Sequence, residues 1–240
     1  MSENVTRTVT DLPALPAEQQ KALIESLQKR LSAPTGDRVK ITQFKKFRLP
    51  DGLETDQALN AVVVDFVASN VFYEDMFDKD EMGPPDCFAI HAEPALMVPS
   101  EKAPKKQGDT CSRCSMNQWG SGPRGKGKAC KNTKLLAILP ADADATTPLW
   151  VIQVSPTGIK FWEEYTRGLV NRGIAPSQVV TEISFDSNVD YPSLRFKSLR
   201  PLEADEYTQV VGRATEAHNR LHTEPDVSGW QPKPARSGRR

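Results

Sequence analysis

The sequence is short of the features that mark several classes of protein. It has four cysteines in 240 residues, aromatic residues make up 7% of it, and its 31 basic side chains balance its 31 acidic ones. So few cysteines exclude a disulfide-rich scaffold. The longest apolar stretch near the N-terminus, residues 61–68, contains Asp65 and falls well short of the roughly 20 apolar residues that span a bilayer. We therefore expect a globular chain with its own hydrophobic core and no membrane partner.

The first ten residues are polar, and no basic region leads into an apolar stretch there. A secretory signal has both features, so its pattern is lacking and we expect a cytoplasmic location. In a reducing compartment, closely spaced cysteines are more typical of a metal site than of a disulfide.

The zero net charge conceals an uneven distribution along the chain. Residues 49–100 hold eleven acidic residues and one basic residue, whereas residues 101–140 hold nine basic and two acidic ones. This segregation predicts that one face or lobe of the folded protein is electropositive.

Hydrophobic spacing divides the chain into four parts. Apolar residues recur at helical spacing early in the sequence, so residues 1–36 are predicted to form an N-terminal helical appendage. Residues 37–200 form the main domain, residues 201–224 a C-terminal helix, and residues 225–240 a disordered basic tail rich in proline and arginine.

The main domain is predicted to consist mostly of short strands, because β-branched and aromatic residues alternate with polar ones. The predicted strands span residues 38–48, 61–67, 71–77, 134–139, 149–154, 178–185 and 194–199, and the predicted helices span residues 157–171 and 203–222. These elements indicate a β-rich α+β fold, built as a small β-barrel or curved sheet with helical decorations.

The strongest local motif is a pair of cysteines separated by two residues, Cys111 and Cys114, followed by Cys130 and preceded by Cys87. A Cys-x2-Cys turn presents two thiolates to one ion, and tetrahedral zinc needs two more ligands, which Cys130 and Cys87 can supply. The spacing supports three ligands directly; the fourth follows by elimination, and His91 is an alternative to Cys87.

The insert of about residues 84–134 that holds these cysteines shows no hydrophobic periodicity, and a structural metal is a means of ordering such a segment. We expect Zn²⁺, while an iron–sulfur cluster uses the same four thiolates and is the alternative cofactor. The simpler interpretation is that these are ordinary buried cysteines.

A glycine-rich stretch within this insert, Gly120–Lys128, matches parts of two nucleotide-binding motifs. No hydrophobic strand precedes it, and Gly127 stands where a P-loop has a hydroxyl residue, so nucleotide hydrolysis is disfavoured. The alternatives that remain are a solvated basic loop and a surface that binds nucleic acid, in which basic side chains contact phosphates and an aromatic ring stacks on a base. The candidate residues of this surface are Trp119, Arg124, Lys126, Lys128, Lys131 and Lys134.

A second cluster of basic and aromatic residues lies on the first predicted strand and comprises Lys45, Lys46, Phe47 and Arg48. Interleaving of this kind is typical of OB-type sheets that follow a single nucleic-acid strand. One of the two phenylalanines of this stretch, Phe44 and Phe47, is expected to belong to the core instead. We expect Phe47 to stack on a base, as Trp119 does.

Four motifs together resemble a group of bacteriophage and mobile-element proteins associated with phage replication and single-stranded DNA binding. The motifs are Pro84–Cys87, Cys111–Ser121, Gly125–Asn132 and Val179–Ile183, within a resemblance that covers about residues 60–200. The chain is also similar to the phage helix-destabilising proteins, in which a zinc-bearing subdomain is inserted into an OB-fold. That resemblance implies an OB-like barrel with a metal subdomain, and the basic ending Arg236–Arg240 departs from the acidic tail of those proteins.

We therefore expect a non-catalytic, largely sequence-independent single-stranded DNA-binding protein of bacteriophage replication or recombination, in the cytoplasm of a bacterial host. It would contact replication or recombination proteins as further partners. The first alternative is a zinc-ribbon interaction factor that docks on a polymerase through its acidic segment. The second is a metal-dependent nuclease, which is disfavoured because no acidic residue stands two positions before a lysine.

Overall fold

The structure is a computed structural model that describes residues 38–74, 83–144 and 146–231, together with Pro16 and Gln19. Residues 37–240 form one compact unit and residues 1–36 another. Apart from Pro16 and Gln19, the predicted N-terminal helical appendage lies outside the described residues. In the part of the chain that is described, no helix is both long and apolar enough to cross a membrane.

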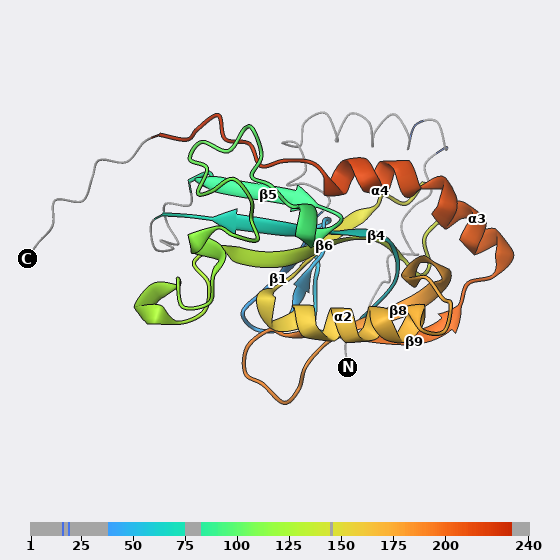
Figure 1. The fold of residues 1–240 in the computed structure, drawn as a ribbon. Helices are drawn as coiled ribbons and strands as arrows, with labels where there is room; N and C mark the ends of the chain where they lie inside the picture. The colour runs from blue at the N-terminus through green and yellow to red at the C-terminus, as the bar shows by residue number, and fades with distance from the viewer. Residues whose placement is uncertain (1–15, 17–18, 20–37, 75–82, 145, 232–240) are drawn as a thin grey trace, which may run out of the picture. The chain divides into compact units, whose positions relative to one another are not determined.

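The described strands form one mixed sheet of nine strands with the order β3-β2-β1-β7-β6-β4-β8-β9, and β5 pairs with β4 beside that path (Figure 1). The strands are β1 (Arg38–Ile41), β2 (Phe47–Arg48), β3 (Glu54–Thr55), β4 (Leu59–Phe72), β5 (Cys87–His91), β6 (Lys131–Pro140), β7 (Trp150–Val154), β8 (Val179–Phe185) and β9 (Leu194–Pro201). The helices are α2 (Pro156–Val170), α3 (Ala204–Gly212) and α4 (Ala214–Leu221). The pairing is antiparallel throughout, except that β1 runs parallel to β7.

Strand β4 organises the sheet because it has different neighbours along its length. Strand β6 pairs with β4 from Ala61 to Val71, with an irregularity in register between Val63 and Asp65. On its other side, β4 pairs first with β8, up to Val62, and then with β5, from Ala68 onward. The second half of β4 therefore carries β5 and the cysteine-bearing insert that follows it.

Each face of the sheet is covered by helix, with α2 on one side and α3 and α4 on the other (Figure 1). Trp162 of α2 is 1% exposed and makes edge contacts with Phe66 of β4 and Phe196 of β9. On the opposite face, Ala217 and Leu221 of α4 are fully buried against alternate residues of β4 and β6. The helix predicted over residues 157–171 is confirmed, since α2 spans Pro156–Val170.

The sheet is curled, so that strands far apart in its order come together. Phe47 of β2 stacks on Phe185 of β8, with ring centroids 4.3 Å apart. Next to this pair, the Lys45 ammonium donates to the main-chain oxygens of Asp186, at 3.0 Å, and of Val189. The sheet is a half-barrel, and the predicted β-rich α+β class with a curved sheet and helical decorations is confirmed.

Residues 92–130 leave the edge of β5 and return to β6, and they pack in two small clusters against the second half of β4. One cluster joins Met97 and Cys111 to Ala68 and Ala89, and the other is built around Phe72, Cys87, Phe88 and Ala103. The insert thus has a small apolar core, which the strands β4 and β5 complete.

Two of the predicted strands differ from the structure. Residues 61–77 were expected to form two strands with a turn at Ser69 and Asn70, but β4 continues through both residues. Their polar groups are buried and bonded across the sheet: the Ser69 carbonyl accepts from Thr133, and the Asn70 amide oxygen accepts from Asn132. Conversely, residues 38–48 form two strands, because a turn at Lys45 separates β1 from β2.

The C-terminal region also departs from expectation. The single helix predicted over residues 203–222 is broken into α3 and α4 at Gly212 and Arg213, in keeping with the low helix propensity of glycine. The start of the segment predicted to be disordered is packed: Val227 lies against the cluster around Phe72, and the Trp230 indole N–H donates to Asp86 at 3.1 Å. The remainder of that tail, from residue 232, lies outside the described residues.

Candidate metal and nucleic-acid site

The four cysteines come together where the insert meets the sheet. Cys87 begins β5, Cys111 and Cys114 lie on the turn between residues 110 and 115, and Cys130 immediately precedes β6. All four are free thiols that line one cavity of about 10 Å³, roughly the space of a single water-sized sphere. The rest of its lining is mostly apolar. The structure therefore gathers residues that are up to 43 positions apart in the sequence.

Main-chain and amide groups approach the sulfurs of this cluster. The Cys114 thiol donates to the Gln107 carbonyl at 3.5 Å, and the Gln107 main chain also hydrogen-bonds to the Cys87 sulfur. The Asn70 side chain hydrogen-bonds to the Cys111 sulfur. The bonds that the Cys87 and Cys111 sulfurs accept favour the thiolate, the form of cysteine that ligates metals, whereas the bond that the Cys114 thiol donates favours its neutral form.

Without an ion, the cavity favours neutral thiols. Burial, followed by the neighbouring cysteines, raises the pKa of Cys130 to about 12. Burial also raises the pKa values of Cys87 and Cys111, in spite of the hydrogen bonds that they accept. Four mutually repelling thiolates are unfavourable in an apolar cavity unless a cation compensates them.

The chemistry of the cluster fits a tetrahedral thiolate site for zinc or an iron–sulfur cluster, since it offers four sulfurs and no competing carboxylate in its lining. As the side chains stand, no three His, Cys, Asp or Glu residues of the described chain are arranged to hold a metal ion. His91, the alternative fourth ligand, does not line the cavity, and its Nδ1 accepts the main-chain N–H of Glu93 at 2.9 Å. Cys87 is the better fourth candidate.

Residues 118–127, which lie between Cys114 and Cys130 in the sequence, form a closed loop. The Gly120 and Gly122 N–H groups both donate to the Gly127 carbonyl, at 2.7 and 3.2 Å. A Cβ atom at Gly122 would stand 2.1 Å from the Lys126 carbonyl oxygen, so only glycine permits this close approach of backbone. Since these main-chain N–H groups are already hydrogen-bonded within the loop, a phosphate would be contacted by the side chains of the loop.

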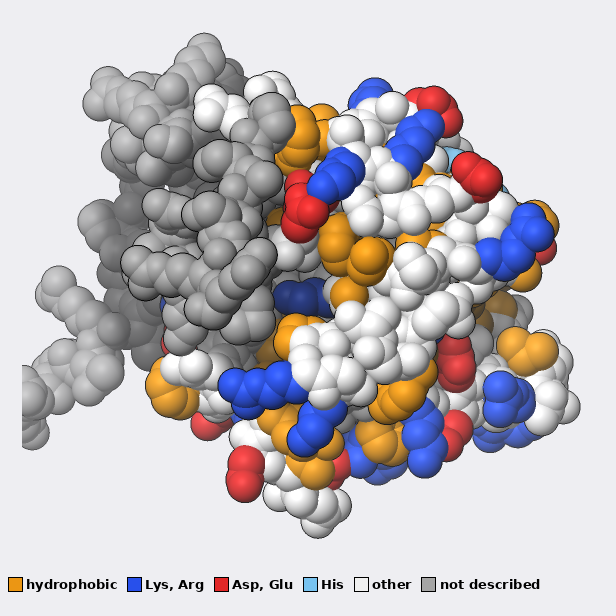
Figure 2. Space-filling model, turned by 60° about the vertical axis from the view of Figure 1, so that its left-hand side comes forward, with side chains coloured by type: hydrophobic (Ala, Val, Ile, Leu, Met, Phe, Trp, Pro, Cys, Tyr) orange, Lys and Arg blue, Asp and Glu red, His pale blue; other side chains and the backbone are white. Residues whose placement is uncertain are grey.

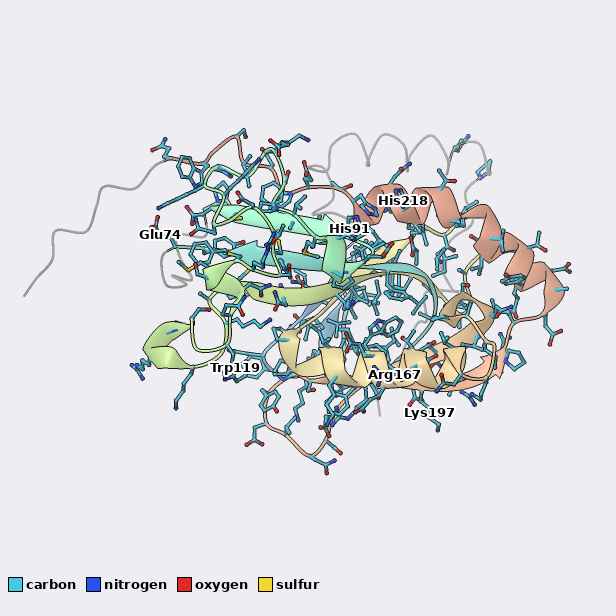
Figure 3. The ribbon with its side chains drawn as sticks, in the orientation of Figure 1. Glu74, His91, Trp119, Arg167, Lys197 and His218 are labelled. Atoms are coloured by element: carbon cyan, nitrogen blue, oxygen red, sulfur yellow. The ribbon has the colours of Figure 1, made fainter. Side chains whose placement is uncertain are left out.

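The loop presents an aromatic ring in a basic surrounding. Trp119 is 83% exposed, and Figure 3 places it on the side of the sheet where α2 lies. Residues 110–134 contain six basic residues and no acidic one. Of these, Arg124 and Lys126 are exposed and have no acidic partner among the described residues. Lysine and arginine side chains also interleave with hydrophobic ones over the lower part of the face in Figure 2.

Comparison with known proteins adds no relative. The chain matches no family model, no curated protein and no solved structure.

The second predicted cluster does not form a free surface. Lys45 is bonded to the β8–β9 connection, and the Arg48 guanidinium pairs with Glu54, with Nε 2.8 Å from Oε1. Phe47 is fully buried against Phe185, so its assignment as a base-stacking ring is wrong. Of this cluster, only Lys46 is exposed with an ammonium that has no partner in the described chain.

Two predicted residues of the insert behave differently from each other. Lys131 is exposed, with its ammonium 6.0 Å from the centre of the Tyr73 ring. Lys134 is 8% exposed on β6, and burial lowers its pKa although Glu163 favours its charged form. Its assignment as a surface phosphate contact is therefore wrong, because its side chain lies on the sheet face toward α2.

The sequence interpretation missed several residues that shape this site. Arg113, between the paired cysteines, is exposed and is the sixth basic residue of the segment 110–134. Three asparagines, Asn70, Asn117 and Asn132, link Lys128 to the cysteine cluster through hydrogen bonds. Asn117 and Asn132 flank the glycine-rich loop in the sequence, which is the one signal that could have drawn attention to them.

Proposed function

We propose that the protein binds single-stranded DNA without catalysis, through the insert surface that carries Trp119, Arg124, Lys126 and Lys131. Its role would be in bacteriophage DNA replication or recombination, in the cytoplasm of a bacterial host. The observation that carries the proposal is the pairing of a tryptophan that is 83% exposed with a segment that has six bases and no acid. A flat ring stacks on any base, and basic side chains neutralise phosphates, so binding would depend little on sequence.

The cysteine cluster supports this function by fixing the loop. We propose that Cys87, Cys111, Cys114 and Cys130 hold a zinc ion, with an iron–sulfur cluster as the alternative. A bound ion would supply the positive charge that four thiolates require and tie the turn at Cys111 to β5 and β6. By fixing the loop, the four cysteines would hold Trp119 outward from the sheet.

The curled sheet supports the OB-like part of the proposal. OB-folds are five-stranded, partly open barrels that bind oligonucleotides, and the zinc-bearing phage helix-destabilising proteins that this chain resembles carry such a fold. Here nine strands form the half-barrel, and the contact between Phe47 and Phe185 brings its ends together.

The direct test is fluorescence anisotropy of labelled oligo-dT and of a duplex of equal length, over a series of salt concentrations. We expect salt-dependent binding to the single strand in preference to the duplex. Replacing Trp119 by alanine should weaken single-strand binding by about 5- to 150-fold, because stacking contributes about 1–3 kcal/mol per base. Tyr207→Ala on α3, a partly exposed aromatic on a different element, is the matched control and should leave affinity unchanged.

Charge reversal provides a second pair of variants. Lys126→Glu should abolish most of the binding at physiological salt, whereas Lys197→Glu on β9 should not, because Lys197 lies well away from Trp119 (Figure 3). Absence of oligo-dT binding by the wild-type protein at low salt would overturn the proposal. Equal losses in the two charge-reversal variants would show that binding is non-specific attraction to the whole surface.

A further inference from the structure

Lys128 differs from the other basic residues of the insert in what its ammonium contacts. It donates to Asn132 Oδ1 at 2.9 Å and to Asn117 Oδ1 at 3.3 Å. Asn117 ends the short helical turn η3 (Ser115–Asn117), and Asn132 lies on β6. The side chain therefore bridges the cysteine-bearing turn and the sheet.

The bridge lies at the base of the Trp119 loop. Asn117 is the residue before residues 118–127, and Lys128 is the residue after them, so their contact closes the loop. Two main-chain bonds reinforce this closure: the Cys130 N–H donates to the Met116 carbonyl at 2.8 Å, and the Ala129 N–H donates to Ser121 Oγ at 3.0 Å. Two of the three N–H donors of the Lys128 ammonium are thus bonded to neutral oxygens within the protein.

Both asparagines connect Lys128 to the cysteine cluster through hydrogen bonds. Asn117 Nδ2 donates to the Cys111 carbonyl at 2.7 Å. Asn132 Nδ2 donates to Asn70 Oδ1 at 2.7 Å, and the Asn70 side chain hydrogen-bonds to the Cys111 sulfur. A continuous chain of hydrogen bonds therefore runs from the base of the loop to one thiol of the cavity.

We propose that Lys128 is a positioning residue that orients the Trp119 loop, and that it does not serve as a phosphate contact. This inference rests on the proposed single-stranded DNA binding and separates two roles within the same basic segment. Lys126 is exposed and its ammonium has no hydrogen-bond or ion-pair partner in the described chain, so it is available to contact a phosphate. Lys128 holds the loop from which Trp119 reaches a base.

The salt dependence of binding distinguishes the two roles. Each phosphate contact to a single strand contributes about −0.7 to the slope of log K against log salt. Lys126→Met should make the slope shallower by about that amount. Lys128→Met, which removes the donors but keeps the length of the side chain, should lower affinity by about tenfold with an unchanged slope. Lys128→Arg should recover most of the affinity because it restores donors to both asparagines.

A measurement without DNA tests the same inference independently. Amide hydrogen exchange at Gly120, whose N–H is bonded across the loop, should be faster in Lys128→Met than in the wild type and unchanged in Lys126→Met. The assignment would be overturned if Lys128→Met made the slope of log K against log salt shallower, as Lys126→Met is expected to do. It would also be overturned if amide exchange at Gly120 did not change in Lys128→Met. If the wild type fails to bind oligo-dT, the proposed function fails, while the exchange result still decides the role of Lys128.

Discussion

Phe47 and Phe185 stack on each other although four strands, β1, β7, β6 and β4, lie between their own strands in the order of the sheet. The contact shows that the sheet bends far enough for its two ends to meet. The salt bridge between Asp186 and Arg195 and the bonds from Lys45 to the adjoining turn surround the same point. The stacking of the buried Phe47 ring on the partly buried Phe185 ring, together with these polar contacts, thus holds the two sides of the half-barrel together.

We expect Phe47→Ala to destabilise the protein by about 3–5 kcal/mol, the usual cost of removing a buried phenylalanine ring. Phe44, three residues earlier and 75% exposed, is the matched control, and its replacement by alanine should change stability by less than about 0.5 kcal/mol. Urea unfolding followed by circular dichroism measures both. Equal stability of the two variants would show that the closure contributes little.

The strands of this sheet could be predicted where side chains alternate, as in β8, but the limits of β4 could not. Ser69 and Asn70 have the sequence character of a turn, and they continue a strand because Thr133 and Asn132, more than 60 positions later, satisfy their polar groups. Such partners belong to the tertiary structure and leave no trace in the local pattern. The contact between Phe47 and Phe185 is equally non-local.

Gly122→Ala tests the shape of the Trp119 loop. The new methyl group would stand 2.1 Å from the Lys126 carbonyl oxygen, so the loop must open. We expect oligo-dT affinity to fall by at least about fivefold, because Trp119 loses its fixed position. The thermal midpoint should change little, since the loop lies outside the main core clusters.

Gly168→Ala is the control for this variant, because no atom lies within 4 Å of the added methyl group and the site is on a helix. It should keep the wild-type affinity and gain a little stability from the better helix propensity of alanine. If Gly122→Ala binds oligo-dT as the wild type does, the closed loop is not needed for binding.

Glu206, near the start of α3, should contribute a pH-dependent part of the stability. Its carboxylate accepts two hydrogen bonds from the Arg200 guanidinium at 2.7 Å and one from the Glu203 N–H, and these partners lower its pKa from 4.5 to about 2. A lowered native pKa stabilises the fold above the unfolded pKa, and the contribution is lost as the pH falls from about 4.5 toward 2.

The free energy of unfolding should therefore fall less steeply over that pH range in Glu206→Gln than in the wild type. Asp205→Asn removes a carboxylate from the same helical turn but leaves the bonds to Arg200 intact, so it should retain the wild-type slope. Urea titrations at several pH values measure the slopes. Parallel curves for the wild type and Glu206→Gln would contradict the assignment.

The sequence predicted which cysteines come together in the candidate site, but it did not predict which basic residues are exposed there. The spacing of Cys111 and Cys114 is a local signal, and the cavity does bring Cys87 and Cys130 to the same place. Whether a lysine is buried or exposed has no comparable signal in the local sequence. Lys134 lies in the apolar run of β6 and is buried with it, while Lys126, eight residues earlier, is exposed on the loop.

The proposed metal site makes the sharpest prediction about composition. Protein purified without chelator should contain about one zinc ion per chain, the ratio expected for a single site with four thiolate ligands. Cys114→Ser and Cys130→Ser should lose the ion, whereas His91→Ala should retain it because His91 does not line the cavity. Elemental analysis measures the stoichiometry, and visible absorption would reveal an iron–sulfur cluster in place of zinc.

Removal of the ion should also loosen the insert, because its apolar clusters are small and the metal would link the turn at Cys111 to β5 and β6. We expect chelator-treated protein to bind oligo-dT more weakly, with faster amide exchange in residues 105–130 and little change in α2. Restoring zinc should reverse both effects. Metal-free wild-type protein with unchanged exchange and unchanged affinity would show that the four thiols are simply buried cysteines, and that hydrogen bonds alone hold the loop.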